Sequence, residues 1–396
     1  MVQRTRGRVA RSVGFGFVAY AFGITMVGTT LPTPLYPIYQ REIGFGSLLT
    51  TLIYAAYAVG VIAALLLFGR ASDVYGRRRV LLAGLAAAAA SAVLFVTDAG
   101  LVPMFAGRVL SGLSAGVFTS TATVALVDLA PPGRQRAAAL VATTVNMLGL
   151  GCGPLLAGLL AQWAPAPLRL PYLADLVLLV PAALGVLLAP EPVAVPPGGR
   201  LRIERPSVAA PARAVFVPAA VAVFAAFSVF GLFTSIAPGF LGQVLGLHSP
   251  ALAGLVVFGM FAGSAGGQVG LARVPTRAAL PAGCVVLVAG LAGIAGSLLA
   301  HSLAALVVGA VVIGVGQALS FRSGIAAVTA ASPEPERAAT VASFFVVAYV
   351  AISLPVVLVG VAATAWGLRT AGLVFTAAVA AVALAALAWV LRLNRR

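Results

Sequence analysis

The chain has 396 residues, of which 61% are hydrophobic and only 9% are charged, and its mean hydropathy is +1.09. A soluble protein carries roughly 25% charged residues, so this composition excludes a water-solvated globular protein and indicates an integral membrane protein. The formal charge of +16 does not indicate a nucleic-acid-binding protein, because the arginines lie between apolar segments instead of along one face of a soluble domain.

Twelve apolar segments follow one another along the chain, each about 20 residues long and without strand alternation. We therefore predict transmembrane helices and not barrel strands. The first segment follows a basic stretch that has no cleavage site of small residues, so we expect it to be a retained span and not a signal peptide. The predicted spans are approximately 15–36, 48–68, 80–97, 101–127, 137–162, 170–189, 214–238, 250–271, 278–299, 302–326, 338–362 and 367–391.

The arginines predict the orientation of these spans, because basic residues near span ends stay in the cytoplasm. With the N-terminus inside, 20 arginines fall on the cytoplasmic side and three fall on the other side, namely Arg41, Arg169 and Arg369. We therefore expect a multi-pass protein of the bacterial cytoplasmic membrane with both termini in the cytoplasm.

The longest polar interval contains several prolines and glycines, which exclude a long helix and mark a linker. We predict an N-terminal six-helix bundle at 1–190, a cytoplasmic linker at 191–213 and a C-terminal six-helix bundle at 214–396.

The two predicted bundles are related by a faint internal repeat. Aligning Arg136 with Arg337 gives an offset of 201 residues, and the same offset places Pro154 on Pro355. Two pseudo-symmetric six-helix halves with the substrate path between them are a transporter architecture. The predicted fold is therefore an all-α membrane protein of twelve transmembrane helices in two bundles.

The loop between the second and third predicted spans, GRASDVYGRRRV at 69–80, sets one acid among four arginines. Its spacing of glycine, aspartate, glycine and two basic residues resembles the corresponding loop of the major facilitator superfamily, and the likeness covers essentially the whole chain. The resemblance implies a secondary transporter of that fold. The residues that carry it are Gly69, Asp73, Gly76, Arg77 and Arg78.

By this resemblance, Arg77 should reach an acid at the cytoplasmic end of the fourth span, where Asp128 stands. Because a helix N-terminus prefers an anion, Asp73 is expected to accept backbone N–H groups from a facing helix end in the other half. We predict that these residues latch the halves at the cytoplasmic face when the path opens outward. The alternative is that Arg77, Arg78 and Arg79 only enforce topology.

Two further patterns resemble motifs of the same family. Span four has an arginine followed by glycines at a spacing of four, at Arg108, Gly112 and Gly116.

Span five resembles the glycine-proline signature that the family associates with exporters exchanging substrate for protons, although one extra residue precedes its last glycine. We expect its glycines on or near one face for close helix contact and its proline to bend the helix, with plain helix packing as the alternative. These residues are Gly149, Gly153, Pro154 and Gly158.

Charges inside spans are candidate functional sites, because each costs on the order of 2.5–3.5 kcal/mol at mid-helix. Asp175 in span six is a candidate partner for Arg108 or a candidate site of proton coupling; the alternative is an interfacial residue. Arg322 either lines the substrate path or extends to the cytoplasmic face. Small polar residues are further candidates for an otherwise apolar path, with packing as the alternative for each: Thr25, Thr29, Asn146, Ser228, Thr234 and Gln317.

These features predict an exporter of small organic molecules, such as drugs, natural products or sugars, that exchanges substrate for protons by alternating access. An importer or facilitator on the same fold is the alternative, and a non-transporting receptor or scaffold is a remote one. The sequence has no nucleophile–base constellation, metal cluster or phosphate loop, so we do not expect an enzyme. The expected partners are a small-molecule substrate, protons and the lipid bilayer, with no cofactor, metal or nucleic acid. We expect a monomer, and antibiotic resistance by efflux as its phenotype.

Overall fold

The structure is a computed structural model that describes residues 2–97, 100–193 and 205–394, and the regular elements in these ranges are all helices. The greater part of the predicted linker, residues 194–204, lies outside the described residues. The elements are α1 (Val2–Thr30), η1 (Thr33–Leu35), α2 (Tyr36–Tyr39), η2 (Gln40–Gly44), α3 (Ser47–Phe68), α4 (Ala71–Tyr75), α5 (Arg77–Thr97), α6 (Leu101–Leu129), α7 (Gln135–Trp163), α8 (Leu170–Leu188), η3 (Ala210–Ala212), α9 (Arg213–Gln243), α10 (Pro250–Gly270), α11 (Thr276–Ala300), α12 (Leu303–Ala331), η4 (Glu334–Glu336) and α13 (Arg337–Asn394).

Among the described residues, 11 helices are long and apolar enough to cross a membrane. The last of them, α13, has 58 residues, which at 1.5 Å per residue is far longer than a hydrocarbon core of about 30 Å. Its helix is interrupted at Gly367, where φ is 75° and ψ is 159°, a conformation that favours glycine. Gly367 therefore divides α13 into two spans, and the predicted all-helical fold of twelve spans is confirmed.

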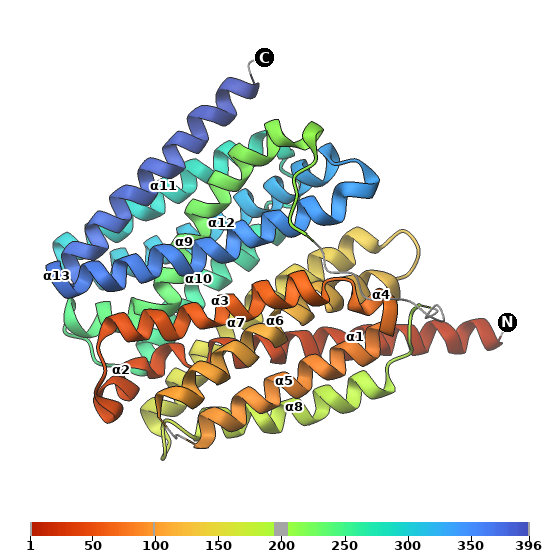
Figure 1. The fold of residues 1–396 in the computed structure, drawn as a ribbon, viewed down its shortest axis with the longest axis horizontal. Helices are drawn as coiled ribbons and strands as arrows, with labels where there is room; N and C mark the ends of the chain where they lie inside the picture. The colour runs from red at the N-terminus through yellow and green to blue at the C-terminus, as the bar shows by residue number, and fades with distance from the viewer. Residues whose placement is uncertain (1, 98–99, 194–204, 395–396) are drawn as a thin grey trace.

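The helices form two groups that lie side by side (Figure 1). Helices α1 to α8, here called the N-terminal half, pack chiefly on one another, through pairs such as α3 with α6, α5 with α6 and α1 with α7. Helices α9 to α13, the C-terminal half, do the same through α11 with α12, α10 with α12 and α9 with α13.

Two helix pairs make most of the contact between the halves, α7 with α10 and α3 with α13. In span numbers these are five with eight and two with eleven. Exchanging the halves turns one pair into the other, which is the arrangement that a pseudo-twofold axis between the halves produces.

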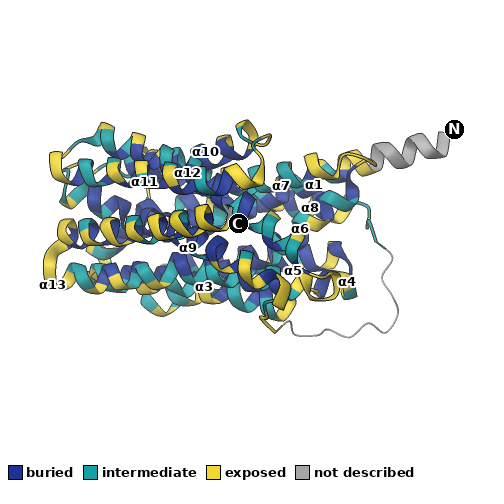
Figure 2. Ribbon diagram, turned by 90° about the horizontal axis from the view of Figure 1, so that it is seen from above, coloured by how far each residue is buried: buried dark blue, intermediate teal, exposed yellow. Residues whose placement is uncertain are grey.

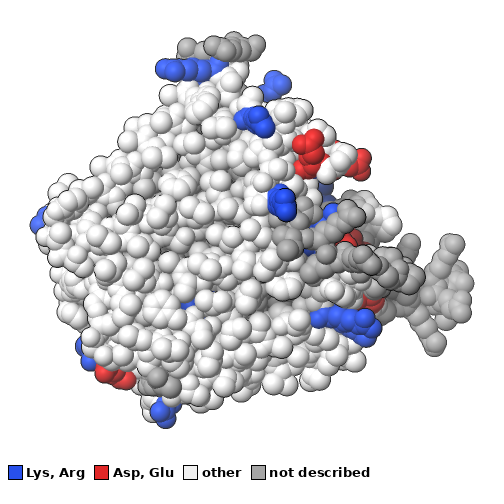
Figure 3. Space-filling view, viewed as in Figure 1, with Lys and Arg blue, Asp and Glu red and all other residues white. Residues whose placement is uncertain are grey.

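The molecule has two ends that differ in charge. The arginine-rich end carries α4, the loops after α6, α10 and α12, and the described arginines near them. The opposite end, here called the α2 end, carries α2, η2 and the bend at Gly367 (Figure 1). On the face shown in Figure 3, charged side chains gather along the margins and hardly any interrupt the broad middle. A belt without charges between two charged ends is what a hydrocarbon layer requires.

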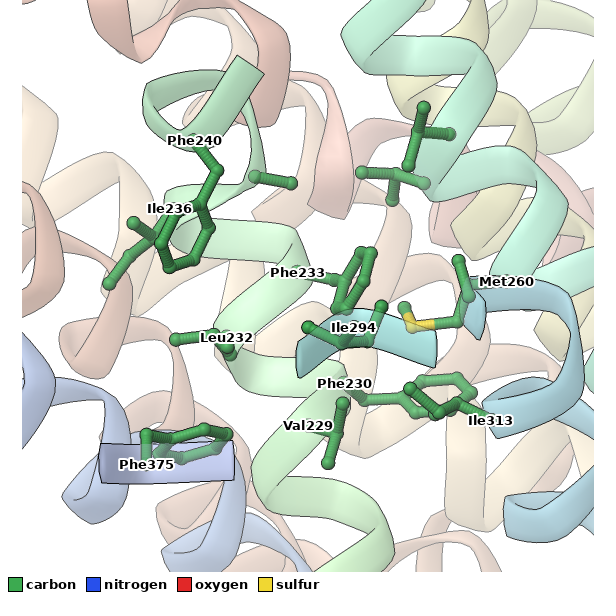
Figure 4. Packing of buried hydrophobic residues seen from close by; sticks show 14 of the residues in the cluster. Val229, Phe230, Leu232, Phe233, Ile236, Phe240, Met260, Ile294, Ile313 and Phe375 are labelled. Carbon is green, nitrogen blue, oxygen red and sulfur yellow. The ribbon is translucent and has the colours of Figure 1, made fainter. Parts of the chain in front are cut away.

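Helix α9 is the most buried of the long helices, with 72% of its most apolar window inside the protein, and Figure 2 shows it surrounded by other helices. Its alternating phenylalanine and aliphatic side chains, among them Phe230, Phe233 and Ile236, form the centre of the largest hydrophobic cluster (Figure 4). The same cluster includes Tyr54 and Met147 of the N-terminal half. The core of the C-terminal half is therefore continuous with the contact between the halves.

The halves are held together by hydrogen bonds near the α2 end. The Thr33 hydroxyl donates to the carbonyl oxygen of Thr234 at 2.8 Å, and the hydroxyls of Thr234 and Tyr54 lie 2.6 Å apart. Nearer this end, the Ser249 hydroxyl donates to Oε1 of Gln162 at 3.0 Å. The interface is thus closed at the α2 end in this structure.

Candidate functional site

The loop between α3 and α5 takes its shape from the short helix α4 and from Gly76. Gly76 has φ 89° and ψ 154°, a region that side chains with a β-carbon rarely adopt, and it turns the chain from α4 into α5. Because α5 begins at Arg77, this turn places the first side chain of α5 back over α4.

Arg77 is the centre of a polar network on this loop, and only 7% of it is exposed. Its Nη1 donates to Asp73 Oδ1 at 2.5 Å and to the Ser72 hydroxyl at 2.6 Å, and its Nε donates to Asp128 Oδ2 at 3.2 Å. Asp128 lies at the last turn of α6, as the sequence predicts. The arginine therefore ties α4, α5 and α6 together.

The start of α5 has a second anionic partner that the sequence analysis missed. The carboxylate of Glu191 accepts the backbone N–H of Arg77 at 2.9 Å and that of Arg78 at 3.0 Å. Unpaired N–H groups at a helix N-terminus attract an anion. The sequence did contain a signal for this contact. The chain has only nine acids, and Glu191 is one of them and stands just after span six, at the same end as the loop of Arg77.

Asp73 makes its described contacts within its own half. Its side chain is 53% exposed and pairs with Arg77, whereas we expected it to accept N–H groups from a helix end in the other half. Arg78 is also exposed, and its Nη1 donates to the Leu187 carbonyl at 3.4 Å.

Arg108 lies deep inside the N-terminal half, with 2% of it exposed. Its Nη1 donates to the carbonyl oxygen of Thr29 on α1 at 2.6 Å. Its guanidinium carbon also lies 4.7 Å from the ring centroid of Tyr57 and 5.5 Å from that of Tyr54, both on α3. An arginine over aromatic faces is stabilised by cation–π attraction, and neither tyrosine was among the predicted site residues.

Asp175 is also buried, with 2% exposed, and among the described residues its Oδ1 has no hydrogen-bond partner. It lines a small internal cavity of about 10 Å³ together with Thr25, Thr29, Ser111 and other residues of α1, α5 and α6. In the part of the chain that the structure describes, no ion pair joins Asp175 to Arg108, whose contacts are with Thr29 and the two tyrosines. The structure therefore does not support the expected pairing of these charges, and it places Asp175 inside the bundle and not at an interface.

The span-four glycines lie where α6 crosses α3. A β-carbon on Gly112 would overlap the carbonyl oxygen of Tyr57, and one on Gly116 would lie 2.6 Å from the β-carbon of Ala64. The two helices approach closely here because these positions have no side chain, which also brings the tyrosines of α3 near Arg108.

The span-five glycines do not share one face, and this expectation was wrong. Gly149 and Gly153 pack against α1 of the same half, whereas Gly158 packs against the carbonyl oxygen of Pro250 at the start of α10. Nine residues are two and a half turns of an α-helix, so Gly149 and Gly158 point in opposite directions.

The carbonyl oxygen of Pro154, on the same helix, lies against Gly254 of α10. Helix α7 continues through Pro154 from Gln135 to Trp163. Its glycine-proline segment is therefore packed between α1 of its own half and α10 of the other half.

The remaining candidates for the substrate path lie in different parts of the protein. Thr25 and Thr29 face the cavity beside Asp175, while Thr234 lies at the contact between the halves and Asn146 is half-buried with its Oδ1 unpartnered among the described residues. Ser228 and Gln317 are fully buried in the C-terminal half, where the Gln317 Oε1 accepts the Ser264 hydroxyl at 2.6 Å.

Arg322 does not line a path between the halves. Its guanidinium donates to the carbonyl oxygens of Ala272 at 2.6 Å and Leu271 at 2.7 Å, directly after α10. A cation is favoured at a helix C-terminus, where carbonyl groups are unpaired. Of the two alternatives for Arg322, the structure supports the one that places it at the arginine-rich end.

The family model described as the Major Facilitator Superfamily matches residues 15–297, more than two thirds of the chain. The chain belongs to the Major Facilitator Superfamily. The resemblance carried by the loop between spans two and three is thereby confirmed, and the fold points to a transporter and not to an enzyme.

Some relatives of this superfamily protein are named as exporters. The cephamycin export protein of Amycolatopsis lactamdurans is 28% identical over 46% of this chain and 37% of its own length. The bacillibactin exporter of Bacillus subtilis is 26% identical over 35% of this chain and 37% of its own length. The chain therefore matches little more than a third of the length of these relatives.

Solved structures match along nearly the whole chain. A peptide transporter POT in complex with sulfate has a TM-score of 0.76 at 17% identity, and the match covers 98% of this chain and 95% of that chain. A bacterial homologue of the human lysosomal transporter Spinster, in an inward-facing and unoccupied conformation, has a TM-score of 0.70 at 17% identity and covers 97% and 98%. At these identities the likeness shows the fold alone.

Proposed function

We propose that this protein exports small organic molecules across a bacterial cytoplasmic membrane in exchange for protons, by alternating access between its two halves. The observation that carries the proposal concerns the interface between the two halves, here called the seam. It is closed at the α2 end by hydrogen bonds of Thr33, Thr234 and Tyr54. The relatives named as exporters support the outward direction. In the proposed orientation, the arginine-rich end is cytoplasmic and this structure faces inward.

A buried charge beside the seam gives the two halves a means of coupling. Arg108 is over the ring of Tyr54, and the hydroxyl of Tyr54 is in turn hydrogen-bonded to Thr234 of the other half. Opening the α2 end must break this last bond, which frees Tyr54 to move and changes the surroundings of a charge that is buried in a low dielectric. Such a link converts movement of the halves into a change in electrostatic energy.

The loop around Arg77 supports the same cycle. In this structure, with the α2 end closed, Asp73 is half exposed and bonded to Arg77 of its own loop. In the opposite state the arginine-rich end must close, and Asp73 is then positioned to accept N–H groups from a helix end of the other half. We therefore assign the latch to the state in which the α2 end is open.

Asp175 is the proposed carrier of the exchanged proton. It is a buried carboxyl group, it lacks a described partner for Oδ1, and it borders a cavity beside the carbonyl that binds Arg108. Ionisable groups within a span that face an internal cavity are the usual elements of proton relays. At the contact between the halves, Phe258 and Phe261 of α10 lie against Gly151 of α7. Such apolar side chains suit an amphiphilic or uncharged organic substrate.

The direct test uses everted membrane vesicles from cells with and without the protein, energised to acidify their interior and monitored by a fluorescent pH probe. Compounds are first selected by growth inhibition of the same two strains. We expect a selected compound to release protons only from vesicles that contain the protein, with uptake of labelled compound at the same time. Accumulation in right-side-out vesicles under an inward proton gradient would instead identify an importer.

A further inference from the structure

An apolar groove on the lipid-facing side of the N-terminal half is separate from the seam. It lies between α3 and α5, both of which pack on α6, and its volume is about 450 Å³. Its walls include Phe68 and Tyr75, and its floor includes Leu113 of α6. Further along α5 the lining residues are small, namely Ala83, Gly84 and Ala87, so no large side chain of this helix fills that part of the space.

The groove has a positive charge at one end. Arg79, in the first turn of α5, lines it at the arginine-rich end, and Ala87 lines it two turns further along the same helix. Eight residues of helix span about 12 Å, which is close to the thickness of one leaflet, about half of a 30 Å hydrocarbon core. The groove thus runs from the depth of a lipid headgroup towards the middle of the bilayer.

The three consecutive arginines of this loop differ in what they bind. Arg77 is engaged by Asp73 and Asp128, and Arg78 donates to the Leu187 carbonyl. Arg79 is exposed, and among the described residues its guanidinium has no hydrogen bond or ion pair. A planar guanidinium that is free to turn towards the bilayer is well matched to a phosphate group.

We propose that this groove binds one anionic phospholipid, with an acyl chain along Ala83 and Ala87 and the phosphate on Arg79. Charge complementarity selects the occupant, because an apolar channel of one leaflet's depth that ends in an unpaired arginine matches a lipid whose headgroup carries net negative charge. Since the groove is walled by α3 and by Tyr75 of α4, the bound lipid also contacts the loop that holds Arg77.

Native mass spectrometry of the delipidated full-length protein, titrated with phosphatidylglycerol or phosphatidylcholine, tests the proposal. We expect one phosphatidylglycerol to bind more tightly than phosphatidylcholine. Arg79→Gln should weaken phosphatidylglycerol about tenfold and remove the preference between the two lipids, whereas Arg134→Gln, an exposed arginine on the loop after α6, should not. Ala87→Leu should block binding of both lipids, whereas Ala86→Leu, an exposed neighbour outside the groove, should not.

The proposal is overturned if the two lipids bind native protein equally, if Arg79→Gln and Arg134→Gln weaken binding to the same extent, or if Ala87→Leu retains native affinity. Appearance of a dimer in place of the lipid-bound monomer would assign the groove to a second copy of the chain. The unfolding temperature of each variant, measured alongside, ensures that a loss of binding is scored only for folded protein.

Discussion

Arg77 shows how much one side chain can determine in a membrane protein with few charges. It is 7% exposed and reaches two carboxylates and a hydroxyl on two neighbouring helices, α4 and α6. The carboxylate of Glu191 then binds the backbone N–H of the same residue. In the sequence this motif is a row of positive charges. In the structure, three acids, Asp73, Asp128 and Glu191, surround the one arginine of the row that is buried.

Replacing this arginine should cost stability. We expect Arg77→Gln to lower the free energy of unfolding by about 1–3 kcal/mol, because hydrogen bonds from a charged donor are lost and Asp128 loses its cation. Heat-induced unfolding of the detergent-purified protein measures this as a lower midpoint. Arg134→Gln, at an exposed loop position, is the matched control and should leave the midpoint unchanged. Equal midpoints for both variants would show that the network does not hold the loop.

At the same scale, Asp175 provides the test of proton coupling. Asparagine has nearly the same shape as aspartic acid but has no proton to exchange, so Asp175→Asn should fold normally and lose the dependence of transport on a pH gradient. Transport in vesicles, measured with and without the gradient, gives the ratio. Glu42→Gln, at the α2 end and outside the cavity, should keep the native ratio. A native ratio in Asp175→Asn would remove this residue from the coupling scheme.

At the scale of the helix, α7 is one of the two helices of the N-terminal half that make most of the contact with the other half. Its Gly149 and Gly153 pack against α1, and its Gly158 and Pro154 pack against α10. Two opposite faces of α7 therefore pack against different halves. A displacement of α10 relative to α1 must change at least one of these two contacts. Close packing of helices through small residues makes such a contact sensitive to any added volume.

A bulky side chain at the contact with α10 should therefore prevent closure of the α2 end. We expect Gly158→Leu to shift the equilibrium towards an open α2 end by about 1–3 kcal/mol, the usual cost of overpacking. A Ser235→Cys reporter in a background lacking Cys152 and Cys284 should react faster with a maleimide, because Ser235 is buried near this end. Gly266→Leu, at a position of α10 with open space around it, should leave the labelling rate at its native value, and an unchanged rate in Gly158→Leu would refute the prediction.

At the scale of the whole molecule, the proposed alternating access requires the contact between α3 and α13 to open and close. A β-carbon at Gly360 on α13 would lie 3.2 Å from the β-carbon of Thr51 on α3, close to the separation of about 3.8 Å found in disulfides. Both residues lie towards the α2 end. A covalent bond at this point would therefore hold the two halves together there.

The double variant Thr51→Cys with Gly360→Cys, without the native cysteines, should form a disulfide on oxidation. We expect transport to stop when the bond forms and to return on addition of a reductant, because the α2 end can no longer open. Each single variant should transport to the same extent in oxidising and reducing conditions. Full transport by the oxidised double variant would show that the halves do not part at this contact.

Much of this protein was determined by its sequence alone. In hydrocarbon only helices and closed barrels satisfy the backbone, and apolar segments of about 20 residues without strand alternation leave the helix. The low charge content allows no water-solvated alternative. The spacing of Gly69, Asp73, Gly76 and Arg77 indicated the superfamily. Part of this spacing has a local cause, because the positive φ of Gly76 requires a glycine at that position. Asp128 was also predicted, because the resemblance to the superfamily calls for an acid at the end of span four and Asp128 stands there.

Only the tertiary structure decided which distant residues meet. Whether Asp175 pairs with Arg108, or Arg322 with the end of α10, depends on helix rotation and tilt, which are set by packing between helices. The weakly periodic, alanine-rich spans of this chain do not define those rotations. Tyr54 and Tyr57, Glu191 and the groove beside Arg79 lie in ordinary apolar or polar stretches of the sequence. They become sites only because helices from distant parts of the chain are packed beside them.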